Sequence, residues 1–194
     1  GSEGRVMDTR QNLMRVAVAA LTLSAAGFAT WTASEGDGPT SARADGVVVH
    51  HPYIPTAGDV PTIGHGSTRY EDGTPVRLTD APITRQRAQQ LASNLHSEEE
   101  SKFKQSLPGV RLFQGEYDLY IDWVGQFGMT NWQKPKSPRT WLLRGEYVRA
   151  CYALLDWRFQ AGRDCKLPEN WGPKGCKGVW TRQQKRHADC MAMQ

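Results

Sequence analysis

The sequence predicts an α+β fold that is predominantly helical, with a small β-hairpin sheet and a helical C-terminal lobe. Two observations carry this prediction. Residues 53–68 are rich in turn formers and hold short groups of β-favouring residues between them, which is typical of short strands joined by tight turns. From Thr84 onward, apolar residues instead recur at the three- and four-residue spacing of helices that bury one face.

The composition is that of an ordinary globular protein. The chain has 194 residues, of which 39% are hydrophobic and 23% are charged, so one hydrophobic core and one domain are expected. The formal net charge is +4, and Lys and Arg are spread through the second half. Such a balance favours anionic partners, and on charge alone both nucleic acid and the bacterial wall or membrane surface qualify.

The N-terminal region has the composition of an export signal. Residues 1–6 precede Met7 and are interpreted as a vector remnant, so Met7 is the expected native start. Residues 13–31 are apolar but rich in Ala, Ser, Thr and Gly, and basic residues precede them. They lack the strongly apolar run of a permanent span. Residues 7–31 are therefore predicted to form a first helix, which is either a signal-anchor or a buried amphipathic helix.

The small sheet is expected between this helix and Thr84. Residues 34–48 begin with helix breakers and have no periodic apolar face, so they predict a loop. A first strand is predicted at 47–51. Asp-Gly at 72–73 is typical of a hairpin turn and predicts a further strand near 76–78.

An acid precedes the expected hairpin, and the hairpin itself holds a carboxylate and a hydroxyl: Glu35, Asp59 and Thr62. An acid, a second carboxylate and a group that positions water are what glycoside hydrolysis requires. Gly64 and Gly66 leave one side of the last strand without side chains, so another backbone or a polymer ligand can come close there.

The remainder of the chain is predicted to be mainly helical. Thr84 is a candidate N-cap, Ser137-Pro138 is a helix start signal, and Gly128 and Gly162 are stop signals. Thr181 with Gln184 fits a capping box. The expected helical segments are 85–107, 113–127, 138–143, 146–160 and 181–191.

Several ordered motifs resemble a known family. Glu35-Gly36 after an apolar, Ala/Ser-rich helix, followed by Val-Pro-Thr-Ile-Gly-His-Gly-Ser-Thr at 60–68, resembles the phage-type lysozymes of glycoside hydrolase family 24, the endolysins. Further similar stretches follow in the family's order at 122–128, 137–147, 157–162 and 178–184. This resemblance implies a lysozyme-like fold and a muramidase. Such an enzyme hydrolyses the β-1,4 bond between N-acetylmuramic acid and N-acetylglucosamine in peptidoglycan and lyses the host cell.

The resemblance also implies roles for the three polar residues. Glu35 would protonate the leaving oxygen, Asp59 would stabilise positive charge or help to activate water, and Thr62 would hold that water. In the family the aspartate usually stands six residues before the threonine, a position held here by Thr56. Asp59 stands only three residues before Thr62 and is equally typical of a turn. The second catalytic role therefore stays open between positions 56 and 59.

The surroundings of these residues can also be anticipated. A general acid must be protonated near neutrality, which requires an apolar environment, and Phe28 and Trp31 on the same helix end are expected to supply it. His65 is expected to line the cleft or to serve structurally. The residues carried over as substrate-binding candidates are Tyr53, His65, Phe127 and Ser137, with a core role more typical of Phe127 and of Trp157.

Two other functions remain open. One is a basic wall-binding protein that has lost catalysis, for which the displaced aspartate is the relevant feature. The other is a lytic transglycosylase, which shares the fold and the substrate and needs only the glutamate.

Metal and nucleotide sites are not expected. His50 and His51 are adjacent and would point to opposite faces of a strand, and no His-x-x-x-His or Cys-x-x-Cys spacing occurs. The Gly-x-Gly at 64–66 is too short for a phosphate-binding loop. We therefore expect no metal and no cofactor.

The four cysteines lie in the C-terminal quarter of the chain. In an exported protein an even number of cysteines predicts disulfides, and four allow three connectivities. We favour Cys165 with Cys176, which closes a loop, and Cys151 with Cys190, which joins two helices. Four buried thiols would be the alternative in a cytosolic protein.

Export and partners follow from the same resemblance. Some phage endolysins that resemble this chain use a weakly apolar signal-anchor helix that later leaves the membrane and packs on the enzyme. Residues 13–31 are expected to associate transiently with the inner membrane in this way, ahead of one lysozyme-like catalytic domain at 32–194. The expected partner is peptidoglycan and not nucleic acid, the expected state is a monomer, and the expected location is the host periplasm.

Overall fold

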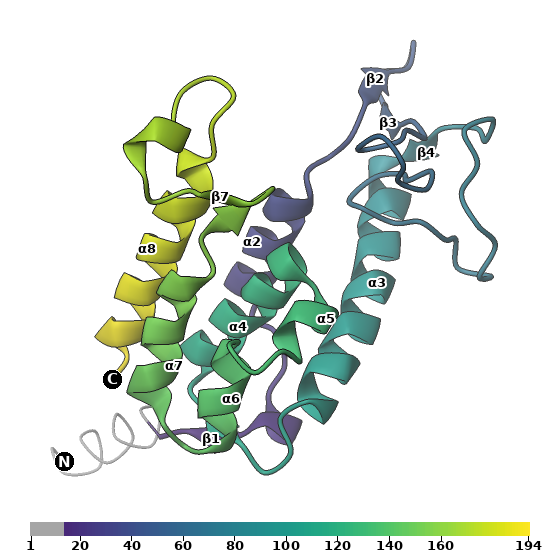
Figure 1. Cartoon of the computed structure of the whole chain (residues 1–194). Coiled ribbons are helices and arrows are strands. Elements are labelled where there is room, and N and C mark those ends of the chain that lie inside the picture. Colours follow the sequence, from purple (N-terminus) through teal and green to yellow (C-terminus); the bar gives the residue numbers. More distant parts are fainter. Residues whose placement is uncertain (1–13) are drawn as a thin grey trace, which may run out of the picture. The chain divides into compact units, whose positions relative to one another are not determined.

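The computed structural model describes residues 14–194 (Figure 1). The vector remnant expected at residues 1–6 and the native start expected at Met7 lie outside the described residues. The described chain divides into two compact units, one formed by Ala25–Lys102 and the other by residues 14–24 together with Phe103–Gln194. The domain predicted at 32–194 draws residues from both units.

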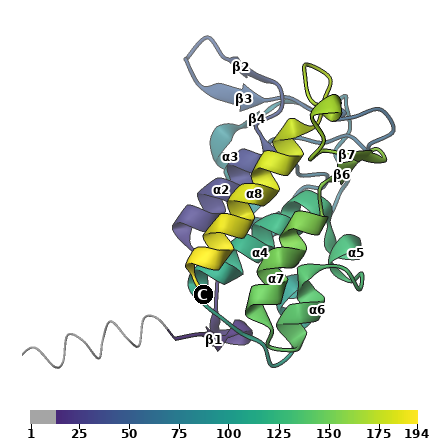
Figure 2. The ribbon, with the colours of Figure 1, turned by 60° about the vertical axis from the view of Figure 1, so that its left-hand side comes forward.

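The first of these, the sheet unit, contains a short antiparallel sheet and two helices. Its strands follow the order β2-β3-β4, with Ser41 opposite Val49 and His50 opposite Ile83 (Figures 1 and 2). Thr84 caps the second helix as predicted, because its hydroxyl accepts a hydrogen bond from Arg87 N at 3.3 Å. The elements are α2 (Ala25–Glu35), β2 (Thr40–Ala42), β3 (Val48–His50), β4 (Ile83–Thr84) and α3 (Arg85–Gln105), of which α3 ends in the other unit.

The strands differ partly from the prediction. β3 confirms the first strand, but β2 lies inside the segment that was expected to be a loop. All three β2 side chains are exposed, so this strand leaves no apolar pattern and is held by its backbone pairing with β3. No strand forms at 76–78, where Val76 N instead donates a single hydrogen bond to Thr68 O at 2.9 Å. The third strand of the sheet is β4.

The hairpin at 53–68 is held by isolated bridges between Tyr53 and Thr62 and between Ile63 and Ser67. A small core lies beneath it, formed by Ile63, Val76, Ile83, Ala88 and Leu91. A Cβ added to Gly64 would lie 2.9 Å from the Ala88 Cβ, so the glycine allows the hairpin to rest directly on α3.

The second unit, the helical unit, begins with the N-terminal segment. This segment is not the continuous helix predicted over residues 7–31, because α2 starts only at Ala25. Before it, β1 (Val16–Ala17) pairs antiparallel with β5 (Arg111–Leu112), and η1 (Val18–Ala20) is a single 3₁₀ turn. Val18 and Leu21 are buried in the core of this unit. The strand pairing and the burial of these side chains outweigh the weak helical preference of the segment.

Helices α4, α7 and α8 form the body of the helical unit. α8 packs against both α4 and α7, α6 packs on α7, and α5 packs on α4 (Figure 2). The largest fully buried side chains are aromatic and include Tyr117, Tyr120, Trp123 and Trp132. The elements are α4 (Gln114–Phe127), α5 (Met129–Trp132), α6 (Pro138–Leu143), α7 (Tyr147–Ala153), η2 (Leu154–Asp156), β6 (Phe159–Gln160), β7 (Arg163–Asp164), η3 (Pro168–Asn170) and α8 (Lys177–Ala192).

The helix predictions for this unit are confirmed for α4 and α6. The helix expected over 146–160 is shorter, since β6 pairs with β7 at its end. α8 starts at Lys177, four residues before the expected N-cap, so the Thr181 hydroxyl bonds the Lys177 carbonyl inside the helix and does not cap it. The fold is a mostly helical α+β fold with small antiparallel sheets, as the sequence predicts.

The favoured disulfide pairs are both present. Cys151 and Cys190 join α7 to α8 with a Cα–Cα distance of 5.6 Å, and Cys165 and Cys176 close the loop before α8 with a Cα–Cα distance of 5.2 Å. Of the helices in the described part of the chain, none is both long and apolar enough to cross a membrane.

Candidate active site

Glu35 is the last residue of α2 and lies half-buried against the backbone of the hairpin. A Cβ added to Gly66 would lie 2.7 Å from Glu35 Oε2, so only a glycine leaves room for the carboxylate at this position. Gly66 also has φ +91°, a left-handed conformation that glycine adopts without strain. The prediction that another backbone comes close is confirmed at Gly64, which lies against Ala88 of α3, whereas the group that approaches Gly66 is the Glu35 side chain.

Tyr53 and Thr62 are paired on this hairpin. Tyr53 N donates to Thr62 O at 2.9 Å and Thr62 N donates to Tyr53 O at 2.8 Å. Burial and the negative charge of Glu35 raise the pKa of the Tyr53 phenol. The Thr62 hydroxyl donates to Val60 O at 3.1 Å, and only 4% of the residue is exposed. The Tyr53 phenol therefore senses the charge of Glu35, while the Tyr53 backbone is paired with that of Thr62.

The chain leaves α2 through a tight turn at residues 35–38, which we call the acid turn. Gly36 and Gly38 have φ +76° and +62°, so both adopt the left-handed conformation. A Cβ on Gly38 would lie 2.5 Å from a ring carbon of Tyr53, which means that this ring packs directly on the turn. Two histidine side chains, His50 and His65, bond the carbonyl groups of the acid turn.

Asp59 and Thr56 lie together at the exposed tip of the hairpin. Asp59 N donates to Thr56 O at 3.0 Å, and the Thr56 hydroxyl donates to Asp59 Oδ2 at 2.5 Å. The two positions that the sequence left open for the second carboxylate therefore belong to one turn. The Asp59 carboxylate contacts the residue that occupies the family's usual aspartate position.

Phe28 and Trp31, which were expected to surround Glu35, pack toward α3. Trp31 is 1% exposed, its Nε1 donates to Glu99 Oε2 at 3.2 Å, and its ring centroid lies 5.2 Å from that of His96. Phe28 lies against the same two rings. Burial raises the pKa of Glu99 and lowers the pKa of His96. This cluster holds α2 on α3, and so fixes the helix that ends in Glu35.

The remaining substrate-binding candidates occupy interior positions. His65 was expected either to line the cleft or to serve structurally. It is 7% exposed and its Nε2 is buried, which favours the structural role. Ser137 has no exposed surface, and its hydroxyl donates to Trp132 O at 2.5 Å, which leaves no exposed atom for a sugar. Phe127 is half-buried and packs against Trp123 and Trp157 at centroid distances of 4.8 and 5.6 Å. Phe127 and Ser137 both belong to the helical unit.

His50 and Gly38 are site residues that the sequence interpretation missed. The alternation of a strand predicts that His50 and His51 point to opposite faces, and His50 is in fact fully buried. Strand alternation was used above to reject a metal site at His50 and His51. It also implies that one of the two histidines faces the interior. No local pattern marks Gly38 as the contact of Tyr53.

Comparisons with known proteins identify the family and the fold of the chain. The phage lysozyme family model matches residues 43–169, a range that contains Asp59 and Thr62 and begins after Glu35. Lysozyme of phage P22, solved as a point mutant, is 22% identical with a TM-score of 0.63, over 88% of this chain and 99% of that one. The endolysin from Escherichia coli O157:H7 phage FAHEc1 is 18% identical with a TM-score of 0.63, over 92% and 96% of the two chains.

The active form of the P1 phage endolysin Lyz is 20% identical with a TM-score of 0.56, over 90% of this chain and 87% of that one. At such identities these likenesses show the lysozyme-like fold. None of the curated proteins compared with the chain matches it. The family model, in contrast, covers well over half of the sequence. On this match, the chain belongs to the phage lysozyme family.

Proposed function

We propose that the protein is an endolysin, a muramidase that hydrolyses the β-1,4 bond between N-acetylmuramic acid and N-acetylglucosamine in peptidoglycan and thereby lyses the host cell. The observation that carries the proposal is the position of Glu35, whose carboxylate lies beside the side-chain-free backbone of Gly66 in a chain of this family. A glycosidase needs a carboxylic acid at the edge of a surface on which a polysaccharide can lie.

In this reaction the proton of Glu35 passes to the oxygen that bridges the two sugars, and the bond from that oxygen to the anomeric carbon breaks. Positive charge then develops on the sugar ring, and Asp59 stabilises it or takes a proton from the attacking water. Water supplies the hydroxyl group that ends on the anomeric carbon. Thr62 holds this water, since its oxygen keeps acceptor capacity after donating its proton to Val60 O.

A lytic transglycosylase is the second candidate, and one observation favours it. Asp59, the second carboxylate of the proposal, lies at an exposed turn and is bonded by Thr56, not by a group near Glu35. A transglycosylase dispenses with it, because a hydroxyl group of the substrate itself attacks the anomeric carbon and forms a 1,6-anhydro product. Only Glu35 is then required.

Digestion of purified peptidoglycan tests both candidates. We expect the wild-type protein to release muropeptides with reducing ends, and Glu35→Gln to be slower by roughly 10²–10⁴-fold, since general acid catalysis contributes about this factor. Glu98→Gln, at an exposed site on α3, is the matched control. Anhydro products from the wild type would assign the transglycosylase. Equal release by wild type and Glu35→Gln would contradict catalysis by Glu35. Release by neither protein would favour a wall-binding protein.

We further propose that residues 13–31 associate transiently with the inner membrane and that the active form works in the periplasm. Val18 and Leu21 are 2% and 8% exposed in the folded chain and cannot lie in a bilayer at the same time, so the two states of this segment exclude each other. The native-start protein should therefore move from the membrane fraction to the periplasmic fraction with an intact N-terminus. A mature chain that begins near Gly27, or one that never enters the membrane fraction, would contradict this proposal.

A further inference from the structure

Two buried histidines lie under the acid turn. His50 comes from β3 and has no exposed surface, whereas His65 comes from the hairpin and is 7% exposed. Their rings pack edge to face, with the centroids 5.5 Å apart and an interplanar angle of 61°. Both rings belong to the sheet unit, as does Glu35.

Each ring bonds one carbonyl group of the acid turn. His65 Nδ1 lies 3.0 Å from Gly36 O, and His50 Nδ1 lies 2.9 Å from Asp37 O. A carbonyl oxygen can only accept a hydrogen bond, so the proton of each ring must lie on Nδ1. Both Nε2 atoms are buried and find no hydrogen-bond partner among the described residues. A proton on Nε2 would be a buried, unsatisfied donor, which also favours the Nδ1–H tautomer.

The charged groups around the pair favour the same tautomer. Asp37 Oδ1 lies 3.3 Å from His65 Nδ1, so the carboxylate also attracts the proton on that nitrogen. Asp37 Oδ2 lies 3.3 Å from Arg85 Nη2 at the start of α3. His51 points to the other face of the strand region and bonds the Ser41 hydroxyl at 2.6 Å.

The acid turn needs such support because of its own sequence. α2 ends at Glu35, and the two glycines of the turn can adopt many backbone conformations. The two carbonyl groups that the histidines bond are those of the two residues directly after Glu35. With both carbonyl groups held, the direction in which the chain leaves the acid is set. His65 also directly precedes Gly66, so its bond to Gly36 O links the residue that the Glu35 carboxylate approaches to the turn that follows Glu35.

We propose that His50 and His65 are positioning residues that hold the acid turn, and through it the Glu35 carboxylate, with both imidazoles in the Nδ1–H form. This inference rests on the proposed function of Glu35. It assigns the histidines to orientation of the acid and not to substrate contact or to metal binding.

Paired substitutions test the inference, because asparagine and glutamine differ in where they place an amide donor. Asn places its NH₂ near the position of the His Nδ1, so His50→Asn and His65→Asn keep the bond to the carbonyl group. Gln carries the same amide one methylene further out and displaces it. A displacement of about 1 Å in a catalytic group can cost about 10²-fold in rate. We therefore expect kcat on soluble, uncrosslinked peptidoglycan chains to fall roughly 10–100-fold for the Gln variants.

Three comparisons make this result specific. KM should change less than threefold in the Gln variants, because substrate contacts remain. The Asn variants should recover most of the lost kcat. His51→Gln, the same change at the neighbouring residue on the opposite face, should leave kcat within about twofold of wild type. A Gln variant that keeps wild-type kcat while Glu35→Gln loses it would overturn the positioning role and leave the proposed function intact.

A direct measurement on the wild-type protein does not depend on any variant or on activity. Nitrogen-15 histidine spectra distinguish the two neutral tautomers, and His50 and His65 are expected to show protonated Nδ1 with unprotonated Nε2. Protonated Nε2 with bare Nδ1 at either ring would overturn the inference even if every variant failed to fold. If the spectra showed the expected tautomers but Glu35→Gln kept full activity, the proposed function of Glu35 would fail. The hydrogen bonds from the two histidines to the acid turn would then have a structural role alone.

Discussion

At the residue scale, Glu35 occupies the space that a side chain at position 66 would fill. The contact is specific, since a Cβ there would lie 2.7 Å from Glu35 Oε2, whereas a Cβ on Gly73 would meet nothing within 4 Å. Both glycines have left-handed backbones, with φ of +91° and +83°. A substitution at either position would strain the backbone, but only one at position 66 would also displace the Glu35 carboxylate.

Gly66→Ala and Gly73→Ala are expected to have similar effects on stability and different effects on activity. Each substitution places a Cβ in the left-handed region, at a cost of roughly 1–2 kcal/mol in the free energy of unfolding. Only Gly66→Ala should also reduce peptidoglycan hydrolysis, by at least about tenfold, because the acid must move. Denaturant unfolding and hydrolysis rates check this. Equal activities of the two variants would show that the acid tolerates the displacement.

Asp59→Asn and Thr56→Ala distinguish the two candidates for the second catalytic role. Both residues are exposed, so neither change should alter the melting temperature appreciably. If Asp59 carries the role, Asp59→Asn should lower kcat by roughly 10²-fold or more, whereas Thr56→Ala removes only the hydrogen bond to the carboxylate and should be mild. Rates on purified peptidoglycan measure both. The reverse ranking would assign the role to position 56.

At the element scale, the contact between α2 and α3 contains a buried acid. Trp31 Nε1 donates to Glu99, and burial raises the pKa of the Glu99 carboxyl above 4.5. The folded state therefore favours the protonated form. Stability from this group is fully present below its unfolded pKa and is lost as the pH rises through the folded value. At pH values above its pKa, the charged carboxylate weakens the packing of α2 on α3.

Glu99→Gln is accordingly expected to stabilise the protein at pH 7, by about 0.5 kcal/mol in the free energy of unfolding. The amide oxygen still accepts the hydrogen bond from Trp31 and carries no charge. The gain should shrink as the pH falls through the raised pKa of Glu99, because the wild-type carboxyl then becomes protonated. Unfolding in denaturant at several pH values measures it, with Glu98→Gln as the exposed control. Destabilisation at pH 7 would refute the assigned cause.

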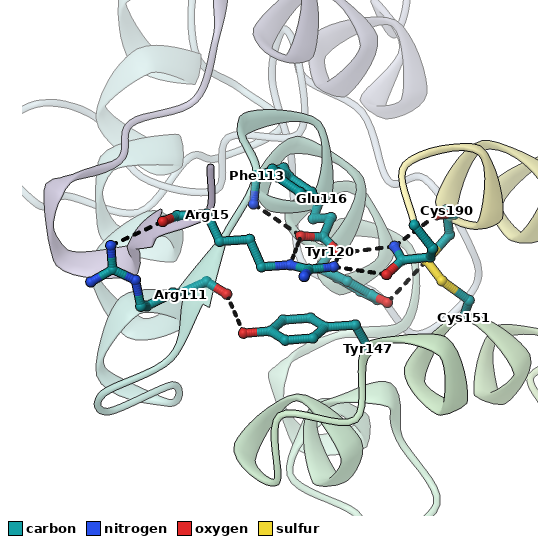
Figure 3. A network of polar contacts seen from close by, with 9 residues as sticks. Arg15, Arg111, Phe113, Glu116, Tyr120, Tyr147, Cys151 and Cys190 are labelled. Atoms are coloured by element: carbon teal, nitrogen blue, oxygen red, sulfur yellow. Dashed lines mark hydrogen bonds and ion pairs between the residues drawn. A yellow bond between two sulfur atoms is a disulfide. The ribbon is translucent and has the colours of Figure 1, made fainter. Parts of the chain in front are cut away.

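At the scale of the whole molecule, the buried carboxylate of Glu116 forms an ion pair with Arg15 and a hydrogen bond with Gln194, and so joins the two ends of the described chain within the helical unit (Figure 3). Glu116 has no exposed surface and accepts hydrogen bonds from Arg15 at 2.9 and 3.2 Å, from Phe113 N at 2.9 Å and from Gln194 at 3.1 Å. The Arg15 guanidinium lies 3.5 Å from the Tyr147 ring centroid. Glu116 therefore depends on the N-terminal segment for its counter-charge.

Arg15→Leu should destabilise the protein by about 3 kcal/mol, because it leaves a carboxylate buried without its cation. The double variant Arg15→Leu with Glu116→Gln should recover part of this loss, since the amide can still bond Phe113 N and Gln194 without a charge. Denaturant unfolding of the three proteins measures the difference. A double variant that is less stable than Arg15→Leu would contradict an uncompensated charge as the cause.

The same ion pair bears on the proposed export. The segment that supplies Arg15 also supplies Val18 and Leu21 to the core, so the helical unit lacks both a counter-charge and core side chains until this segment has docked. A chain whose N-terminal residues lie in a membrane would therefore hold an incomplete helical unit.

The sequence by itself determined several helix boundaries, because helix caps and stop signals act over a few residues. Thr84, Gly128 and Ser137-Pro138 mark boundaries that the structure keeps. The motif at 60–68 likewise identified the family, and the loop between Cys165 and Cys176 is short enough that their pairing was the favoured one. Each of these signals lies within a short stretch of sequence.

Only the tertiary structure decided which distant groups meet. β1 pairs with β5, a strand far along the chain. The side chains of β1 and β2 are all exposed, so neither strand has a buried apolar face that the sequence could reveal. The meeting of Gly66 with Glu35, and of His50 with the Asp37 carbonyl, arises in the same way. The physical reason is that periodicity and capping report local backbone preference, whereas strand pairing and the placement of a catalytic acid depend on long-range packing.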